Sequence, residues 1–153
     1  MDSEITNIID EIITWGYQKT SSSETDNINR LEYLLVNLYR QIIDLPEESD
    51  DNIEIQHPDF NYNEILGFVK LNFPSFGEYN EVFNSVEDFV NPEVTIGSAL
   101  DDLSDIILDL STVKWYLDNS LENEAIWQIK FSFDIHFKHH LLGLLKYIHD
   151  KNK

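Results

Sequence analysis

The residue types that could carry chemistry in this chain are aspartate and histidine, and they gather in two stretches. An acidic run, DDLSD, begins at Asp101, and the C-terminal stretch holds four of the five histidines. His136 and His140 are four residues apart, so a helix places both rings on one face. Two imidazoles on one face can bind a transition metal jointly when another side chain supplies a further ligand.

Four aspartates share one side of the helix predicted around the acidic run, opposite its apolar residues: Asp101, Asp102, Asp105 and Asp109. Like charges three or four residues apart on a helix repel each other by some tenths of a kcal/mol a pair. A histidine on a neighbouring helix would relieve this repulsion, because it can donate a hydrogen bond from either ring nitrogen.

We therefore predict a polar seam between the two helices, in which His136 or His140 donates to Asp102 or Asp105. The candidate members of the polar seam are Asp101, Asp102, Asp105, His136 and His140. The alternative is a divalent-metal site made by Asp102, Asp105, His136 and His140, although the H-E-x-x-H spacing of zinc hydrolases is absent. His139 is expected to point away from the seam and to face solvent.

Other catalytic chemistry has no support in the sequence. The chain has no cysteine and only five glycines, and it lacks both the G-x-S-x-G elbow and a glycine-rich phosphate loop. We predict no catalytic residues and leave enzymatic activity open, with a preference against it. No cofactor is predicted besides the divalent metal of the alternative.

The chain is strongly acidic, and its charge is unevenly distributed. The formal net charge is −19. Residues 128–153 contain five lysines and two aspartates, a net of +3, so residues 1–127 carry −22. Nucleic-acid binding is not expected, because a protein neutralises phosphates with basic side chains. No apolar run is long enough to span a membrane, and the lack of cysteine favours a reducing compartment, so we expect a cytoplasmic protein.

Two classes of function remain. The first is a small acidic interaction or regulatory module, such as an immunity-type inhibitor, which binds a basic protein partner. The second is a metal-binding or metal-dependent helical protein that uses the aspartate–histidine seam. The charge also has a plainer interpretation, in which the basic last helix packs beside acidic helices of the same chain. The sequence does not predict the oligomeric state.

The apolar pattern predicts one all-α domain over residues 1–153. Apolar side chains recur at helical spacing in five segments, which are residues 3–18, 27–45, 62–72, 98–119 and 121–150. Residues 18–27 and 46–58 are polar connectors. No segment shows the alternation of a β-strand, so a bundle of about five helices is expected.

Residues 74–96 form a long connection that is rich in aromatic and apolar side chains. The apolar residues at 82, 83, 86, 89 and 90 have the spacing of a short helix. We expect this aromatic loop to pack over the bundle as a cover, with the lid of a pocket as the alternative.

The last predicted helix is apolar around nearly its whole circumference. This pattern is typical of a buried helix, so we expect the C-terminal helix to be central in the bundle. Gly143 lies in its narrow polar strip and is expected to permit the close approach of another helix.

Most of the chain resembles a known family, and the resemblance is specific over the last third. Residues 101–106 match an acidic D-D-x-x-D-I helix. The final helix follows a pattern of tryptophan, phenylalanine, histidine and leucine at Trp127, Phe131 or Phe133, His136, His140, Leu141, Leu144 and His149. Both features are similar to DUF5063, an uncharacterised bacterial domain of unknown function, although that family's tryptophan-glycine pair is Phe137-Lys138 here. The resemblance implies a helical fold and no established activity.

Overall fold

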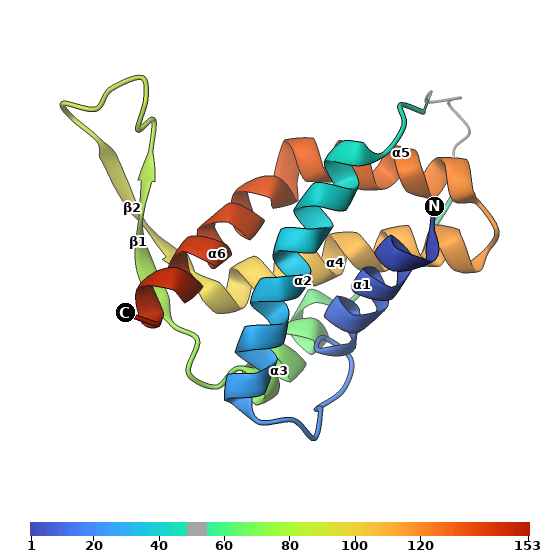
Figure 1. The fold of residues 1–153 in the computed structure, drawn as a ribbon, viewed down its shortest axis with the longest axis horizontal. Coiled ribbons are helices and arrows are strands. Elements are labelled where there is room, and N and C mark those ends of the chain that lie inside the picture. Colours follow the sequence, from blue (N-terminus) through green and yellow to red (C-terminus); the bar gives the residue numbers. More distant parts are fainter. Residues whose placement is uncertain (49–54) are drawn as a thin grey trace.

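The computed structural model describes residues 1–48 and 55–153, which form a helical bundle with one projecting hairpin (Figure 1). The predicted all-α bundle is confirmed. Its helices are α1 (Ser3–Thr14), α2 (Glu24–Asp44), α3 (Tyr62–Asn72), α4 (Ala99–Asp118), α5 (Glu122–Ser132), the π-helical turn η1 (Phe133–Phe137) and α6 (Lys138–Lys151). Part of the predicted connector 46–58, namely residues 49–54, lies outside the described residues.

Short polar side chains begin the first four helices. Asn61 and Ser98 cap α3 and α4 by accepting a hydrogen bond from the backbone N–H three residues on. Asp2 caps α1, and Ser23 caps α2, which begins at Glu24 and therefore before the expected residue 27. The predicted extension of α1 to residue 18 is a series of turns after Thr14.

The connector between α1 and α2 is fixed to α3 by a buried amide. The side chain of Asn72 accepts from the backbone N–H of Thr20 at 2.8 Å and donates to the carbonyl oxygens of Trp15 and Gln18 at 3.1 and 2.9 Å. Asn27 joins this network by accepting from the Trp15 indole at 3.3 Å. Because a buried amide must find partners, this polar connector has a defined path across the bundle.

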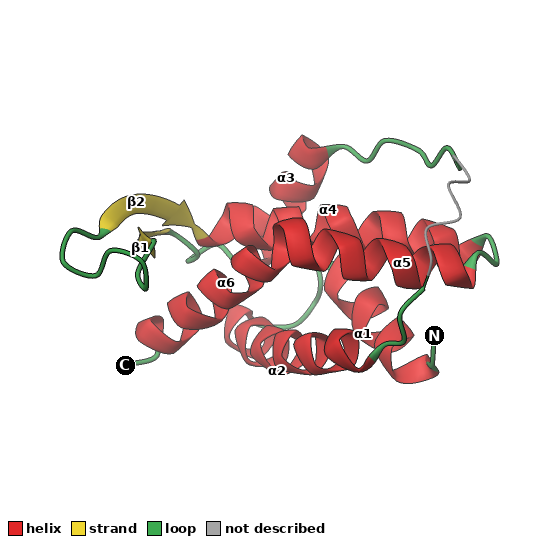
Figure 2. Cartoon of the chain, turned by 90° about the horizontal axis from the view of Figure 1, so that it is seen from above, coloured by secondary structure: helices red, strands yellow, loops and turns green. Residues whose placement is uncertain are grey.

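The helices are arranged in layers around α4. Helices α1 and α2 lie on one side of α4 and of the C-terminal helix, which consists of α5, η1 and α6. Helix α3 packs against α4 from the other side (Figure 2). The face of α4 that makes these contacts is fully buried at Leu103, Ile106, Ile107, Leu110 and Val113. Burial of such aliphatic side chains is the main favourable term for the fold.

The C-terminal helix packs between α2 and α4, and its central face is buried at Phe133, Phe137, Leu141, Leu144 and Ile148. It is less enclosed than its apolar circumference predicts, because Phe131, Ile135 and Leu142 remain exposed. The π-helical turn η1 interrupts it, and a π turn holds more residues than an α turn. The side chains after η1 therefore point in directions that differ from those expected if one uninterrupted α-helix continued from α5.

The region predicted as an aromatic cover contains the largest difference from the sequence analysis. Strands β1 (Glu78–Phe83) and β2 (Glu93–Ser98) pair antiparallel in a hairpin, whereas the apolar pattern predicts no strand. The hairpin projects from the bundle beside the start of α4 and the end of α6 (Figure 1). Its base packs on the bundle through Phe76, while its tip lies away from the helices. The segment is therefore not a cover.

Candidate functional site

The polar seam lies where α4 runs beside η1 and α6. Nδ1 of His140 lies 2.7 Å from Oδ1 of Asp102, and its Nε2 lies 3.4 Å from Oδ2 of Asp105. Nδ1 of His136 lies 2.7 Å from Oδ2 of Asp109. An ionised carboxylate only accepts hydrogen bonds, so each Nδ1 carries the proton and donates.

The antiparallel course of the two helices explains this pairing. As residue numbers rise along α4 from Asp102 to Asp109, they fall along the facing segment from His140 to His136. The π-helical turn contains His136 and ends just before α6, where His140 lies. The two imidazole centroids are consequently only 4.9 Å apart and face the same row of aspartates.

Two aspartates are placed differently from the prediction. Asp101 was a candidate seam member, but its carboxylate accepts from the hydroxyl of Tyr62 on α3 at 2.5 Å. Asp109 was absent from the candidate seam, although it belongs to the same acidic stripe and binds His136. A register argument from two antiparallel helices would have found it, because it lies one turn beyond Asp105.

His139 is half exposed, and it also has a partner that is not expected from the sequence. Its Nε2 lies 2.7 Å from a carboxylate oxygen of Glu81 on β1. The imidazole also stacks on Phe83, with centroids 5.5 Å apart and an interplanar angle of 17°. His139 therefore faces the hairpin as well as solvent, and it joins β1 to α6.

Tyr79 connects the hairpin directly to the seam. Its hydroxyl donates to Oδ2 of Asp102 at 2.5 Å, so the carboxylate of Asp102 accepts from a tyrosine and a histidine at once. The tyrosine fits because Gly97 and Gly143 have no side chains: a Cβ on either would lie within 2.6 Å of a Tyr79 atom. Gly143 thus permits the approach of a tyrosine from the hairpin rather than the approach of a helix.

Burial and hydrogen bonding shift several pKa values in the seam. The hydrogen bond to Asp102 raises the pKa of His140, and the charges of Asp105 and Glu81 act in the same direction, while burial opposes them. Burial raises the pKa of Asp105 and of Asp109, against the lowering effect of the nearby histidines. Burial and the bond to Asp102 raise the pKa of Tyr79, which therefore stays a neutral donor.

The geometry also brings metal-ligand types together. One donor atom each from Asp105, His136 and His140 lie within 4.8 Å of one another. Asp102 was part of the predicted metal set, but both of its oxygens already accept from Tyr79 and His140. The candidate ligands are therefore the two histidines and Asp105, with Asp102 and Asp109 behind them.

The hairpin exposes an unusual concentration of apolar surface. Among the described residues, fifteen large apolar side chains are exposed, and seven of them lie between residues 82 and 96. The tip carries the most exposed of these, with Val86 at 90%, Phe89 at 80% and Val90 at 71%. Val82 and Val94 are directly paired across the strands and extend the apolar surface along the outer face.

The hairpin also lacks positive charge. Residues 78–98 contain five acidic residues and no lysine or arginine, and no basic residue occurs between Lys70 and Lys114. The acidic side chains of Glu78, Glu87 and Glu93 are exposed next to the apolar ones. This surface therefore combines apolar contact area with negative potential.

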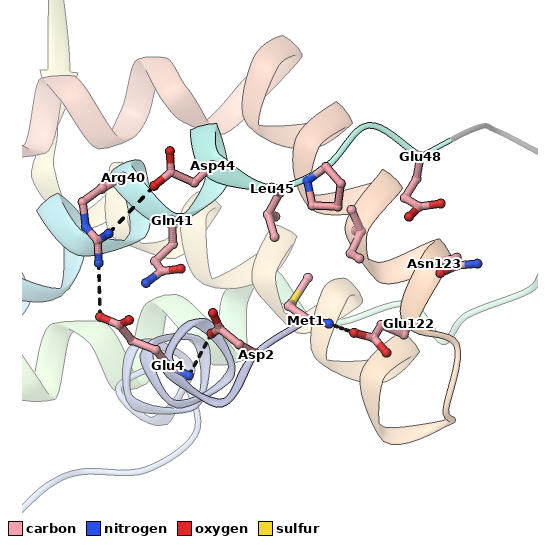
Figure 3. Close-up of a pocket in the computed structure, with 12 residues that line it drawn as sticks. Met1, Asp2, Glu4, Arg40, Gln41, Asp44, Leu45, Glu48, Glu122 and Asn123 are labelled. Carbon is pink, nitrogen blue, oxygen red and sulfur yellow. Dashed lines mark hydrogen bonds and ion pairs between the residues drawn. The ribbon is translucent and has the colours of Figure 1, made fainter.

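A polar pocket of about 660 Å³ lies at the other end of the bundle, where α1 begins and α2 ends (Figure 3). Its charged groups largely pair with one another: Arg40 contacts Glu4 at 3.3 Å and Asp44 at 3.8 Å, and the amino group of Met1 contacts Glu122. The N–H of Glu4 is bound by Asp2 as the helix cap. The contacts within this pocket thus join α1 to α2 and α5.

None of the helices in the described ranges has the length and apolar character that crossing a membrane requires.

The fold and the site define a class of protein: a helical bundle with a histidine–aspartate seam at the base of a projecting hairpin. The family model described as a domain of unknown function (DUF5063) matches residues 3–152. The chain belongs to this family, as its acidic helix and histidine-rich last helix predict.

Comparison with solved structures agrees on the fold. The crystal structure of protein BF1032 from Bacteroides fragilis is similar over 98% of this chain and 90% of that chain, with a TM-score of 0.74 and 16% sequence identity. At this identity the similarity shows the fold alone. The comparison with curated proteins finds no match.

Proposed function

We propose that this protein is an acidic interaction module of regulatory type, which binds a basic protein partner through its hairpin. The hairpin surface consists of the exposed apolar residues Val82, Val86, Phe89, Val90, Val94 and Ile96. The proposal includes a cytoplasmic location, which the absence of cysteine favours.

The observation that carries this proposal is the exposure of the hairpin tip. Exposing Phe89 and two valines to water has a hydrophobic cost, since burial of apolar area contributes about 25 cal/mol per Å². A contiguous apolar patch with a polar rim is typical of a protein–protein contact site. The hairpin surface has this composition, with Glu87 and Glu93 at its edge.

The tip also has a defined conformation before any partner binds. Asn84 adopts a positive φ of 46°, and its side chain accepts from the N–H of Glu93 at 3.1 Å. Asp88 accepts from the N–H of Asn91 at 3.1 Å. A preformed loop loses less conformational entropy on binding than a flexible one, so this turn is suited to recognition.

The negative charge of the hairpin favours a basic protein as the partner. Its five acidic residues without a basic one favour a partner with lysine or arginine around an apolar contact area. Such opposite charges accelerate association, and salt screens this effect. We therefore expect an association rate that falls by on the order of tenfold between low and physiological salt.

The test is affinity capture from a native lysate, followed by binding kinetics with each purified partner. The probe variant is Val86→Ser/Phe89→Ser, which removes apolar area from the tip without touching the bundle. The matched control is Val36→Ser on α2, where an apolar side chain is 54% exposed but belongs to a helix. A basic protein captured by the wild type and the control, and lost from the probe variant, would support the proposal.

Charge is tested separately with Glu87→Gln/Glu93→Gln, because both side chains are exposed and neither takes part in the hydrogen bonds that define the tip. This variant is expected to lower the association rate with little change in the dissociation rate. An acidic partner, a partner retained by the tip variant, or self-association of the chain through the tip would contradict the proposal.

A further inference from the structure

We propose that Asp105, His136 and His140 form a binding site for one divalent transition-metal ion of the zinc type. The site lies on the bundle at the base of the hairpin, and it is separate from the apolar tip through which a partner is proposed to bind. The proposal rests on the geometry of the seam and is independent of the proposed function.

The candidate ligand atoms are close to the separation that a metal requires. Zinc lies about 2.0–2.2 Å from nitrogen and oxygen ligands, so the ligand atoms of a tetrahedral site are about 3.4 Å apart. Nε2 of His140 is already 3.4 Å from Oδ2 of Asp105. One ring nitrogen or carboxylate oxygen from each of the three residues lies within 4.8 Å of the other two, so binding one metal ion requires these side chains to move closer together. His136 can make this movement because its side chain is 44% exposed.

The carboxylates that are hydrogen-bonded to the two candidate histidine ligands are the strongest argument for the site. A histidine that binds a metal usually donates its other ring N–H to a carboxylate, which fixes the ring and increases its basicity. Both histidines show this arrangement, with Nδ1 of His136 on Asp109 and Nδ1 of His140 on Asp102. Asp102 is in turn held by the hydroxyl of Tyr79. The bonds at Nδ1 leave Nε2 of each ring as the atom for a metal.

The ligand types identify the class of metal. Two imidazole nitrogens with one carboxylate oxygen suit zinc, iron, copper and nickel, whereas magnesium and calcium prefer all-oxygen sites. Three protein ligands leave a coordination position for water. Asp105 and His140 are partly exposed, so an ion can reach them from solvent.

The experiment uses the full chain without a histidine tag, after treatment with a chelator that is then removed. The probe is Co²⁺, because its visible d–d absorption reports nitrogen and oxygen ligation directly. Zn²⁺ competition against bound Co²⁺ then ranks the two ions. One equivalent of Co²⁺ with a saturable absorption band is expected. Zn²⁺ should displace it, because Co²⁺ loses ligand-field stabilisation when it leaves its octahedral aqua ion for a tetrahedral site, whereas Zn²⁺ has none to lose.

Four variants distinguish this site from adventitious binding. His136→Gln and Asp105→Asn remove one ligand each at partly exposed positions, and each should weaken Co²⁺ binding by at least tenfold. Asp109→Asn removes only the carboxylate behind His136 and should weaken binding by about 10- to 100-fold. His149→Gln is the matched control, since it removes an exposed histidine of the same helix and should leave binding unchanged.

Circular dichroism of each variant checks that the bundle is folded before its affinity is compared. Absence of saturable Co²⁺ binding to the folded wild type would overturn the proposal. Equal binding by His136→Gln and wild type, or loss of binding in His149→Gln, would overturn it as well.

Discussion

At the scale of single residues, the decisive group is the carboxylate of Asp102. Asp102 is only 5% exposed, and its two carboxylate oxygens accept from Tyr79 and His140. A buried charge is costly unless hydrogen bonds and an opposite charge compensate it. Asp102 therefore makes the orientation of His140 and the position of Tyr79 interdependent, and it links the hairpin to the C-terminal helix.

The first prediction concerns the pKa of His140. The hydrogen bond to Asp102 raises it above the ordinary value of 6.5. In Asp102→Asn this cause is removed, so the pKa of His140 should fall relative to wild type. NMR titration of the imidazole protons in metal-free protein measures both values. The control is Asp101→Asn, whose carboxylate binds Tyr62 instead and which should leave His140 unchanged.

The raised pKa also has a definite effect on stability. A histidine whose pKa is higher in the folded state stabilises the fold fully below its unfolded pKa, and this contribution is lost as pH rises through the folded pKa. Wild type should therefore lose stability relative to His140→Gln as pH rises from about 6 through the folded value. A wild-type advantage that grows over this pH range would contradict the assignment.

At the scale of elements, the helices were predictable and the hairpin was not. The caps at Asn61 and Ser98 and the apolar stripe of α4 are local signals, and α3 and α4 accordingly begin within one residue of the expected positions. The hairpin residues are mostly exposed on both faces, so the usual alternation of buried and exposed residues is weak. The β-branched run from Val94 to Ile96 and the Asn91-Pro92 turn were the available signals.

The candidate site was predictable in its residue types, but its pairing depends on the register between the two antiparallel helices. The spacing of His136 and His140 and the aspartates of α4 predicted neighbouring groups. The π-helical turn could not be derived from a uniform wheel, because it changes the rotation between successive residues. Tyr79 was missed because its contact joins residues 23 positions apart through a hairpin that was not predicted.

The second prediction tests how the hairpin is fixed to the bundle. In Gly143→Ala the added Cβ would lie 2.5 Å from the hydroxyl of Tyr79, so the tyrosine must move away from Asp102. The hairpin amides should then exchange with solvent faster, while the amides of α4 keep their protection. Amide hydrogen exchange followed by mass spectrometry measures both regions.

The matched control for this variant is Gly67→Ala, because no atom lies within 4 Å of a Cβ at that position. It should leave hairpin exchange unchanged and favour the helix slightly. Unchanged hairpin exchange in Gly143→Ala would show that the contact of Tyr79 with Asp102 does not fix the hairpin.

At the scale of the whole molecule, the bundle depends on one apolar core. Leu103 on α4 and Leu144 on α6 are both fully buried. The third prediction is that Leu103→Ala and Leu144→Ala each lower the free energy of unfolding by about 2–5 kcal/mol, because each leaves a cavity. Urea denaturation measures this loss.

The control is Leu142→Ala, at a half-exposed position of α6, which should lower the free energy of unfolding clearly less. A loss below about 1 kcal/mol at Leu103 or Leu144 would mean that the site is not core.

The last prediction concerns the net charge of −19, which acts on the molecule as a whole. Repulsion among the excess carboxylates destabilises the compact state, and salt screens it. Salt also weakens ion pairs such as Arg30–Glu11, but exposed pairs contribute only about 0–1 kcal/mol each. Relief of repulsion should dominate, so the urea midpoint should rise when NaCl is increased from about 10 mM, where the Debye length is about 30 Å, to about 0.5 M. The triple variant Glu78→Gln/Glu87→Gln/Glu93→Gln carries less excess negative charge, so its urea midpoint should rise less over the same increase in NaCl. A midpoint that falls with salt would show that attractive ion pairs, rather than the acidic excess, govern the electrostatic part of stability.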